Sequence, residues 1–145
     1  MSIDALYEMP GHLIRRAHQI SGAVFSAHLA GHDVTSMQYA ALEAIASQPG
    51  IDATRLSELI AIDRATLGGV LDRLEAKGAV LRAPSPRDRR VKTVSLTPAG
   101  AALLREIGPR VAAVQSEMMQ RLSPAEQRQF VALLKTFVGR LPAGE

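Results

Sequence analysis

The residues with the clearest chemical purpose are five cations that lie within eleven positions of one another. They are Arg82, Arg87, Arg89, Arg90 and Lys92, and Asp88 is the one acid among them. The rest of the chain carries 12 basic and 13 acidic residues, so this segment holds the whole positive excess. Such a cluster is suited to neutralising phosphates, and a long arginine can also enter a narrow A·T-rich minor groove. A solvated charged loop would have the same composition, so the interpretation depends on the elements that present the cluster.

The elements expected around the cluster are two helices and a hairpin. Asp52 can cap a short helix, and Asp63 can cap a second one over residues 64–77, which ends at a glycine. Strands are expected at residues 80–83 and 91–96, with the basic cluster at the tip between them. The two helices are separated by a gap of only four residues, 61–64, and this spacing predicts a helix-turn-helix. The hairpin directly after it predicts a wing.

This arrangement assigns DNA contacts to the helix-turn-helix and to the wing. The second helix of such a motif enters the major groove with its first residues at base edges, where arginine can bind guanine through two hydrogen bonds. Gly68 and Gly69 are unusual there, because each glycine inside a helix costs about 1 kcal/mol relative to alanine. Either another helix packs closely on the pair, or the DNA backbone approaches it. Asp88 is expected to hold an arginine in position. The predicted DNA-binding residues are Thr54, Arg64, Thr66, Gly68, Gly69, Arg73, Arg87, Arg89, Arg90 and Lys92.

Long amphipathic helices are expected on both sides of this motif. Capping signals at Thr35, Thr97 and Ser123 begin three of them, and Pro109 predicts a kink. The predicted fold is mainly α with a small β-hairpin wing, in a single domain over residues 1–145. A winged helix-turn-helix lobe spans 35–97, and helices in 10–34 and 98–141 form a dimerisation region, because their apolar stripes exceed what so small a lobe can cover.

Several classes of function are excluded or disfavoured. The 145 residues include no cysteine, which removes disulfides, thiolate metal sites and cysteine nucleophiles. Aromatic residues make up 3%, too few for a base-stacking platform. No phosphate loop, His-Glu-x-x-His or Gly-x-Ser-x-Gly motif occurs, so no enzyme is expected.

We see no signal peptide or membrane span, and expect a cytoplasmic protein without cofactor or metal. His28 and His32 have i, i+4 spacing but no third ligand nearby, which favours an interface or capping role.

Three segments closely resemble the MarR family of bacterial winged-helix regulators. They read LSELIAIDRATLGGVLDRLEAKGAV at 56–80, SPRDRR at 85–90 and VSLTPAG at 94–100. The resemblance implies a homodimer whose first and last helices interlock, with two winged lobes on palindromic DNA. The segments HLIRRAHQ at 12–19, QYAAL at 38–42 and DRATL at 63–67 are similar to the branch that controls aromatic-acid degradation. In that branch the effectors are aromatic acids, hydroxycinnamates or their coenzyme A thioesters.

A site for such an anion would need an apolar wall and a guanidinium. On a helical projection Arg16 lies at the border of the apolar stripe of the first long helix, with His12 near it, while Arg15 points almost opposite. Each is a candidate, although an ordinary solvent-facing or interface arginine fits the same pattern. Tyr39 can donate a hydroxyl bond to the ligand or belong to the core. The candidate ligand-binding residues are Arg16, Arg15, His12 and Tyr39.

These features predict a homodimeric DNA-binding regulator. We expect a repressor that leaves its palindromic operator when it binds an anionic aromatic ligand or the coenzyme A thioester of one. The expected partners are double-stranded DNA, a second copy of the chain and that small effector. The alternative is an architectural DNA-binding protein without an effector, which would depend more on phosphate contacts and less on base sequence.

Overall fold

The computed structural model describes residues 2–139, and the predicted end of the last helix at residue 141 lies outside them. The elements are α1 (Ile3–Tyr7), α2 (Pro10–His28), α3 (Ser36–Ser47), β1 (Ile51–Asp52), α4 (Ala53–Ile60), α5 (Arg64–Ala76), β2 (Val80–Pro84), β3 (Lys92–Leu96), α6 (Pro98–Met118) and α7 (Pro124–Val138). The mainly helical fold with a small antiparallel sheet is the one predicted. Among the described residues, no helix is both long and apolar enough to span a membrane.

The lobe formed by α3, α4, α5 and the strands packs around one apolar core. Leu42, Leu56 and Leu74 are fully buried in it together with Val80 and Val94. The capping residues expected from the sequence begin its helices, since the side chains of Thr35, Asp52 and Asp63 accept backbone N–H bonds at the starts of α3, α4 and α5. The short turn between α4 and α5 therefore forms the predicted helix-turn-helix.

The sheet has a third strand that the sequence did not indicate. The strands are antiparallel in the order β1-β3-β2, with Ile51 opposite Val94 and Val80 opposite Leu96. Two residues are too few to show an alternating pattern, so β1 has no signature in the sequence. Its pairing fixes the base of the wing to the start of α4.

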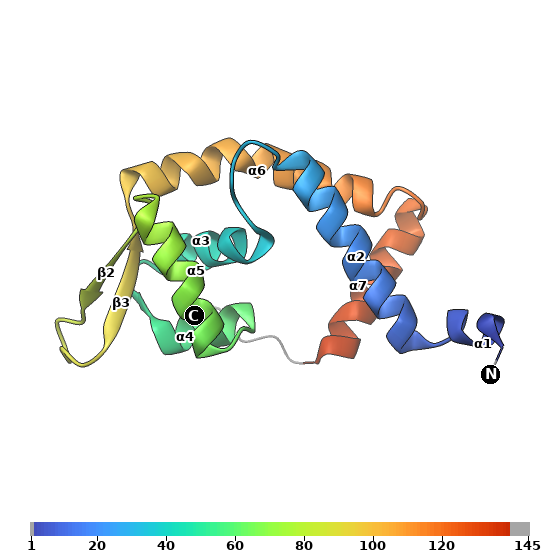
Figure 1. Cartoon of the computed structure of the whole chain (residues 1–145), viewed down its shortest axis with the longest axis horizontal. Helices are drawn as coiled ribbons and strands as arrows, with labels where there is room; N and C mark the ends of the chain where they lie inside the picture. The colour runs from blue at the N-terminus through green and yellow to red at the C-terminus, as the bar shows by residue number, and fades with distance from the viewer. Residues whose placement is uncertain (1, 140–145) are drawn as a thin grey trace.

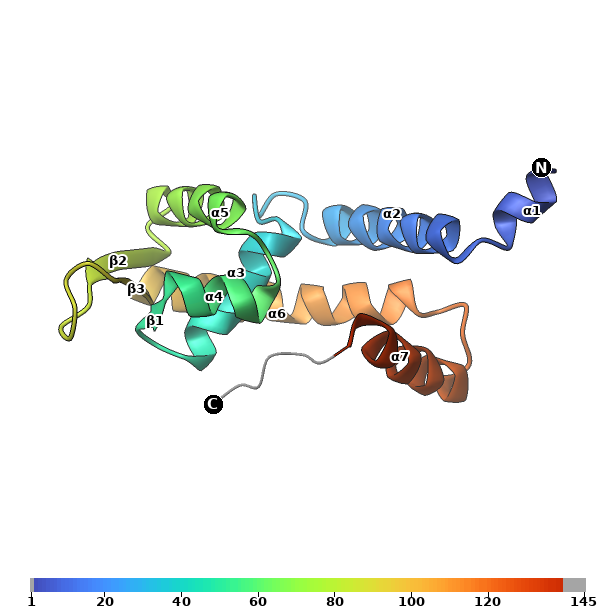
Figure 2. The ribbon, with the colours of Figure 1, turned by 90° about the horizontal axis from the view of Figure 1, so that it is seen from below.

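A second core joins α2 to the middle of α6. Phe25 and Leu29 pack there against Ile107, Val111 and Val114. The helix α6 continues through Pro109 as one element and runs in a bowed course from the wing to the loop before α7 (Figure 1). The helices α2 and α7 overlap in Figure 1 but are separated in the perpendicular view of Figure 2.

The start of α6 lies against the turn that follows α5. Thr97 donates its backbone N–H to the carbonyl of Ala79 (3.0 Å) and its hydroxyl to the carbonyl of Gly78 (2.5 Å). A Cβ on Gly100 would lie 2.0 Å from the same Ala79 oxygen, so only glycine fits there. These contacts fix the end of α5 to the beginning of α6.

Candidate nucleic-acid interface

The helix α5 presents its first turn to solvent. The side chain of Asp63 accepts from the backbone N–H of Thr66 (2.8 Å) and from its hydroxyl (2.6 Å). Those bonds, with the hydroxyl bond as the larger effect, hold the pKa of the Asp63 carboxyl below its ordinary value. Asp63 and Thr66 thus form a charged cap that fixes the start of α5, and the oxygen of Thr66 can still accept a bond from outside.

Arg64 is directed toward α4 and meets the wing. Its guanidinium donates to the hydroxyl of Thr54 (2.5 Å). Arg64, Thr54, Arg90 and Lys92 line a hollow of about 280 Å³ between α4, α5 and the base of the wing, with Ala53 and Val91 completing it. We call this the basic hollow. It brings together four of the predicted DNA-binding residues from three elements, and three of them are cations.

The tip of the wing is organised by Asp88. The side chain of Arg90 donates two bonds of 3.1 Å to its carboxylate, and the Arg90 N–H donates a third of 3.0 Å. These bonds hold the pKa of Asp88 below its ordinary value. The prediction that Asp88 positions an arginine is confirmed. Arg87 and Arg89 are exposed, and the structure gives neither guanidinium a carboxylate partner within residues 2–139.

Arg82 has a different role from the rest of the cluster. From β2 it binds two carboxylates of α5, Asp72 (2.6 Å) and Glu75 (2.5 Å), which raises the pKa of its guanidinium. It therefore joins the wing to α5. The signal for this was the spacing of Asp72 and Glu75, which lie one turn apart on the same helix face.

Gly68 and Gly69 lie on the open side of α5. A Cβ at either position would meet no atom within 4 Å among the described residues, beyond the helix's own backbone. Packing of another helix on the pair, one of the two expectations, is therefore wrong for residues 2–139. Arg73 follows them on the exposed surface of the same helix. An approach of DNA to the pair stays a prediction.

The four candidate ligand residues divide between the first half of α2 and the start of α3. Arg15 and Arg16 are exposed on the first half of α2, and His12 lies 3.4 Å from the guanidinium of Arg15. Tyr39 packs against the second core from α3 and donates its hydroxyl to Glu43 (2.7 Å). Burial, followed by that bond, raises the pKa of Tyr39 to about 12. A ligand accepting from Tyr39 would have to displace Glu43.

The two histidines suggested as a weak metal pair contact separate partners. His28 binds Glu117, and His32 lies 3.3 Å from Glu106, both on α6. The structure gathers no group of three or more potential metal ligands within residues 2–139. These contacts link the end of α2 and the loop after it to α6 beside the second core, and the expected capping or interface role of the histidines stays a prediction.

The fold and the arrangement of the basic side chains define a winged helix-turn-helix DNA-binding protein. The MarR family model matches residues 34–92. The repressor NicR of Pseudomonas putida is 33% identical over 131 residues, which cover 90% of this chain and 83% of NicR. The chain belongs to the MarR family of transcriptional regulators, which are not enzymes.

Two solved structures from this family share nearly the whole fold. BpsR of Bordetella bronchiseptica, whose DNA binding is regulated by 6-hydroxynicotinic acid, is 34% identical with a TM-score of 0.88, covering 92% of this chain and 95% of BpsR. A cysteine-to-serine mutant of Escherichia coli MarR in complex with operator DNA is 28% identical with a TM-score of 0.87, covering 96% of this chain and 100% of the mutant. The predicted resemblance to the MarR family is confirmed.

Proposed function

We propose that the protein is a homodimeric repressor that binds an inverted-repeat operator and is released from it by an anionic aromatic compound. The observation that carries the DNA-binding part is the basic hollow, where Arg64 of α5 meets Arg90 and Lys92 of the wing. We call α5 the recognition helix from here on. It supplies base contacts through Arg64, Thr66 and Arg73, with Gly68 and Gly69 admitting the DNA backbone.

Phosphate binding is assigned to the wing and to the start of α4. Arg87 and Arg89 are exposed cations at the wing tip, and Arg90 and Lys92 lie at the edge of the basic hollow beside Thr54. Contacts of this kind position the protein on the duplex and make binding salt-dependent, whereas base contacts select the sequence. An architectural protein would show the first property without the second.

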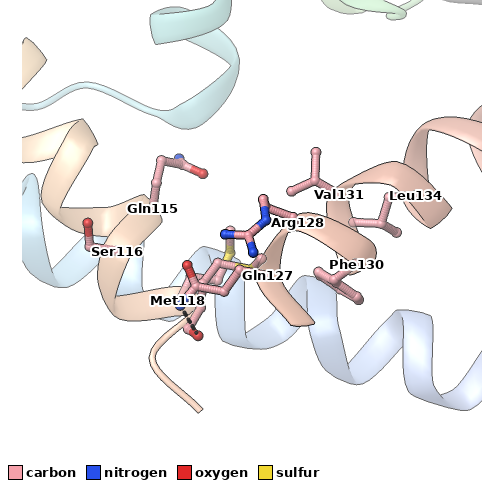
Figure 3. Close-up of a pocket in the computed structure, with 9 residues that line it drawn as sticks. Gln115, Ser116, Met118, Gln127, Arg128, Phe130, Val131 and Leu134 are labelled. Atoms are coloured by element: carbon pink, nitrogen blue, oxygen red, sulfur yellow. Dashed lines mark hydrogen bonds between the residues drawn. The ribbon is translucent and has the colours of Figure 1, made fainter. Parts of the chain in front are cut away.

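The homodimer is supported by apolar surface that the described chain leaves uncovered. In α7, Phe130, Leu133 and Phe137 are 37, 60 and 68% exposed, and the structure buries no residue of this helix within residues 2–139. A groove of about 620 Å³ lies between α6 and α7, with Val131 and Leu134 on its α7 side and Met118 on its α6 side (Figure 3). A second copy supplies the cover, as expected for members of this family.

The N-terminal helices offer the complementary surface. In α2, Leu13, Ile14 and Ile20 are about half exposed, as are Ile3 and Tyr7 in α1. Residues 10–34 and 98–141 therefore keep their assignment as the dimerisation region, and 35–97 as the DNA-binding lobe. Two lobes related by a two-fold axis would bind half-sites about one helical turn, ~10 bp, apart or a multiple of it.

The effector class is inferred from the chemistry of relatives. BpsR is regulated by 6-hydroxynicotinic acid, an anionic heteroaromatic ring. A matching site here needs a cation beside apolar surface, and Arg16, Arg15 and His12 lie on the same helix as exposed Leu13 and Ile14. The partner copy would provide the missing wall. Coenzyme A thioesters of such acids remain in the class, since their phosphates would also compete for the basic wing.

The DNA-binding proposal is tested by selecting sites from random double-stranded DNA and measuring affinity by fluorescence anisotropy. Arg64→Ala is expected to lose roughly 1 to 3 kcal/mol and to relax base preference at a defined position. The Arg89→Ala, Arg90→Ala double variant should weaken binding and lower its salt dependence. If the double variant keeps wild-type affinity and salt slope, the wing assignment is wrong.

The effector proposal is tested by adding benzoates, hydroxynicotinates, hydroxycinnamates and their thioesters to the complex with operator. A tenfold loss of operator affinity corresponds to about 1.4 kcal/mol of coupling. Arg16→Ala and Arg15→Ala are compared with wild type. A response that both variants retain in full rejects the arginine anchor. No response to any compound favours the architectural alternative.

A further inference from the structure

One lysine attaches the C-terminal end of the recognition helix to the segment that joins α2 to α3. Lys77, the C-cap of α5, extends its ammonium to the loop between α2 and α3. It donates to the carbonyl of Asp33 and to Oε1 of Gln38 (3.1 Å), and lies 3.4 Å from the Asp33 carboxylate. Three acceptors thus surround a side chain that is 27% exposed.

The loop that receives Lys77 is the turn from α2 into the lobe. Asp33 has a φ of 49°, in the left-handed region, and Gln38 is 3% exposed. Gln38 Oε1 also accepts from the backbone N–H of Thr35 (3.4 Å), which completes the capping box of α3. Lys77 therefore binds a rigid, buried acceptor at the point where α2 leads into the lobe.

The other side of the same helix end is attached to α6 through the backbone. Thr97 bonds to the carbonyls of Gly78 and Ala79, and Gly100 lies against Ala79. The end of the recognition helix is consequently in contact with the start of α6 and with the loop that follows α2. The attachment to α6 needs no particular side chain from α5, whereas the attachment to the α2–α3 loop depends on Lys77.

We propose that Lys77 is a positioning residue that sets the angle between the recognition helix and α2, and so the distance between the two recognition helices of the dimer. The inference rests on the proposed dimeric binding to an inverted repeat. In such a dimer a small rotation of each lobe about the α2–α3 loop changes the separation of the half-sites that fit. Fixing that rotation restricts the dimer to one half-site spacing.

A positioning role differs measurably from a phosphate contact. The ammonium of Lys77 is occupied by protein acceptors, so its removal leaves the number of neutralised phosphates unchanged. Lys92, the first residue of β3, is exposed at the basic hollow and serves as the matched control. Removal of a phosphate contact should reduce the salt slope by about 1. Removal of Lys77 should leave that slope at the wild-type value.

The experiment uses the operator that the wild-type protein selects, together with versions in which one or two base pairs are added or removed between the half-sites. Lys77→Met keeps the apolar stem of the side chain. We expect it to bind the parent operator roughly tenfold more weakly, to discriminate less among the spacings, and to keep the salt slope. Lys92→Met should lower the salt slope and keep the spacing profile. Lys77→Arg should restore most of the spacing discrimination.

Two results would overturn the proposal: a wild-type spacing profile for Lys77→Met, or a fall in its salt slope like that of Lys92→Met. If circular dichroism shows that Lys77→Met is unfolded, Lys77→Gln replaces it, because glutamine is polar and suits this partly exposed position but lacks the ammonium. An unchanged spacing profile in Lys77→Gln would then reject the coupling. Failure of the wild type to select any inverted repeat would instead reject the dimeric function on which the inference rests.

Discussion

Arg82 has the charge expected of a DNA contact, yet its partners are two carboxylates of the recognition helix. Asp72 and Glu75 hold it from one side of α5, and its backbone belongs to β2. This side chain thereby joins the wing to the recognition helix. The distinction matters because Arg87, five residues further on, has the same side chain but is exposed at the tip.

Replacing Arg82 by methionine should therefore lower stability. The network is partly exposed, so we expect a loss of about 1 kcal/mol in the free energy of unfolding, measured by urea denaturation. Arg87→Met is the matched control and should leave the urea midpoint unchanged while weakening DNA binding. Equal midpoints for the two variants would show that the Arg82 network does not stabilise the lobe.

The Asp63 cap leads to a pH-dependent prediction. Because its folded-state pKa is lowered, mainly by the Thr66 hydroxyl, the cap contributes stability at neutral pH that is lost as pH falls through that lowered pKa. Thr66→Val removes the hydroxyl bond, so the pKa of Asp63 should rise toward its ordinary value. Carboxyl chemical shifts followed by NMR measure that pKa directly. The stability difference between wild type and Thr66→Val should vanish in acid, and a difference independent of pH would exclude the hydroxyl bond as its cause.

At the scale of single elements, the sequence was most informative where capping residues and apolar periodicity agree. Thr35 with Gln38, and Ser123 with Glu126, form the expected capping boxes and fix the starts of α3 and α7. The five-residue α1 and the two-residue β1 were missed, because α1 has fewer than two helical turns and β1 a single alternation, so neither repeats a pattern. The role of Arg82 in joining the wing to α5 was missed for another reason, because Asp72 and Glu75 become its neighbours only when the wing folds back on α5.

On the open side of the recognition helix, one substitution is expected to raise the stability of the protein and to lower its affinity for DNA. A Cβ at position 69 would meet no atom of residues 2–139 within 4 Å beyond the helix's own backbone, and alanine has a higher helix propensity than glycine. Gly69→Ala should therefore raise the free energy of unfolding by about 1 kcal/mol. If the DNA backbone approaches this position, the same variant should bind operator more weakly. Thermal melting and anisotropy measure the two effects. A more stable protein with unchanged affinity would show that DNA does not come close to Gly69.

For the whole molecule, the uncovered face of α7 predicts the assembly state. Leu133→Lys places a charge on a residue that is 60% exposed in the single chain and covered in the proposed dimer. Sedimentation should then give about 15.5 kDa instead of twice that mass. Leu81→Lys is the control, because Leu81 is 61% exposed on the wing and should leave the dimer intact. Persistence of the dimer in Leu133→Lys would place the interface elsewhere.

The two apolar cores have a consequence for the lifetime of the protein. Leu103 of α6 packs against both of them. The lobe core is complete within one chain, whereas α7 and the first half of α2 depend on a second copy for burial. On dilution to single chains, backbone amides in α7 should exchange quickly while those of α3 and α5 stay protected. The regulator's own abundance would thus determine how readily proteases cleave it, and a scarce regulator would be degraded faster than an abundant one.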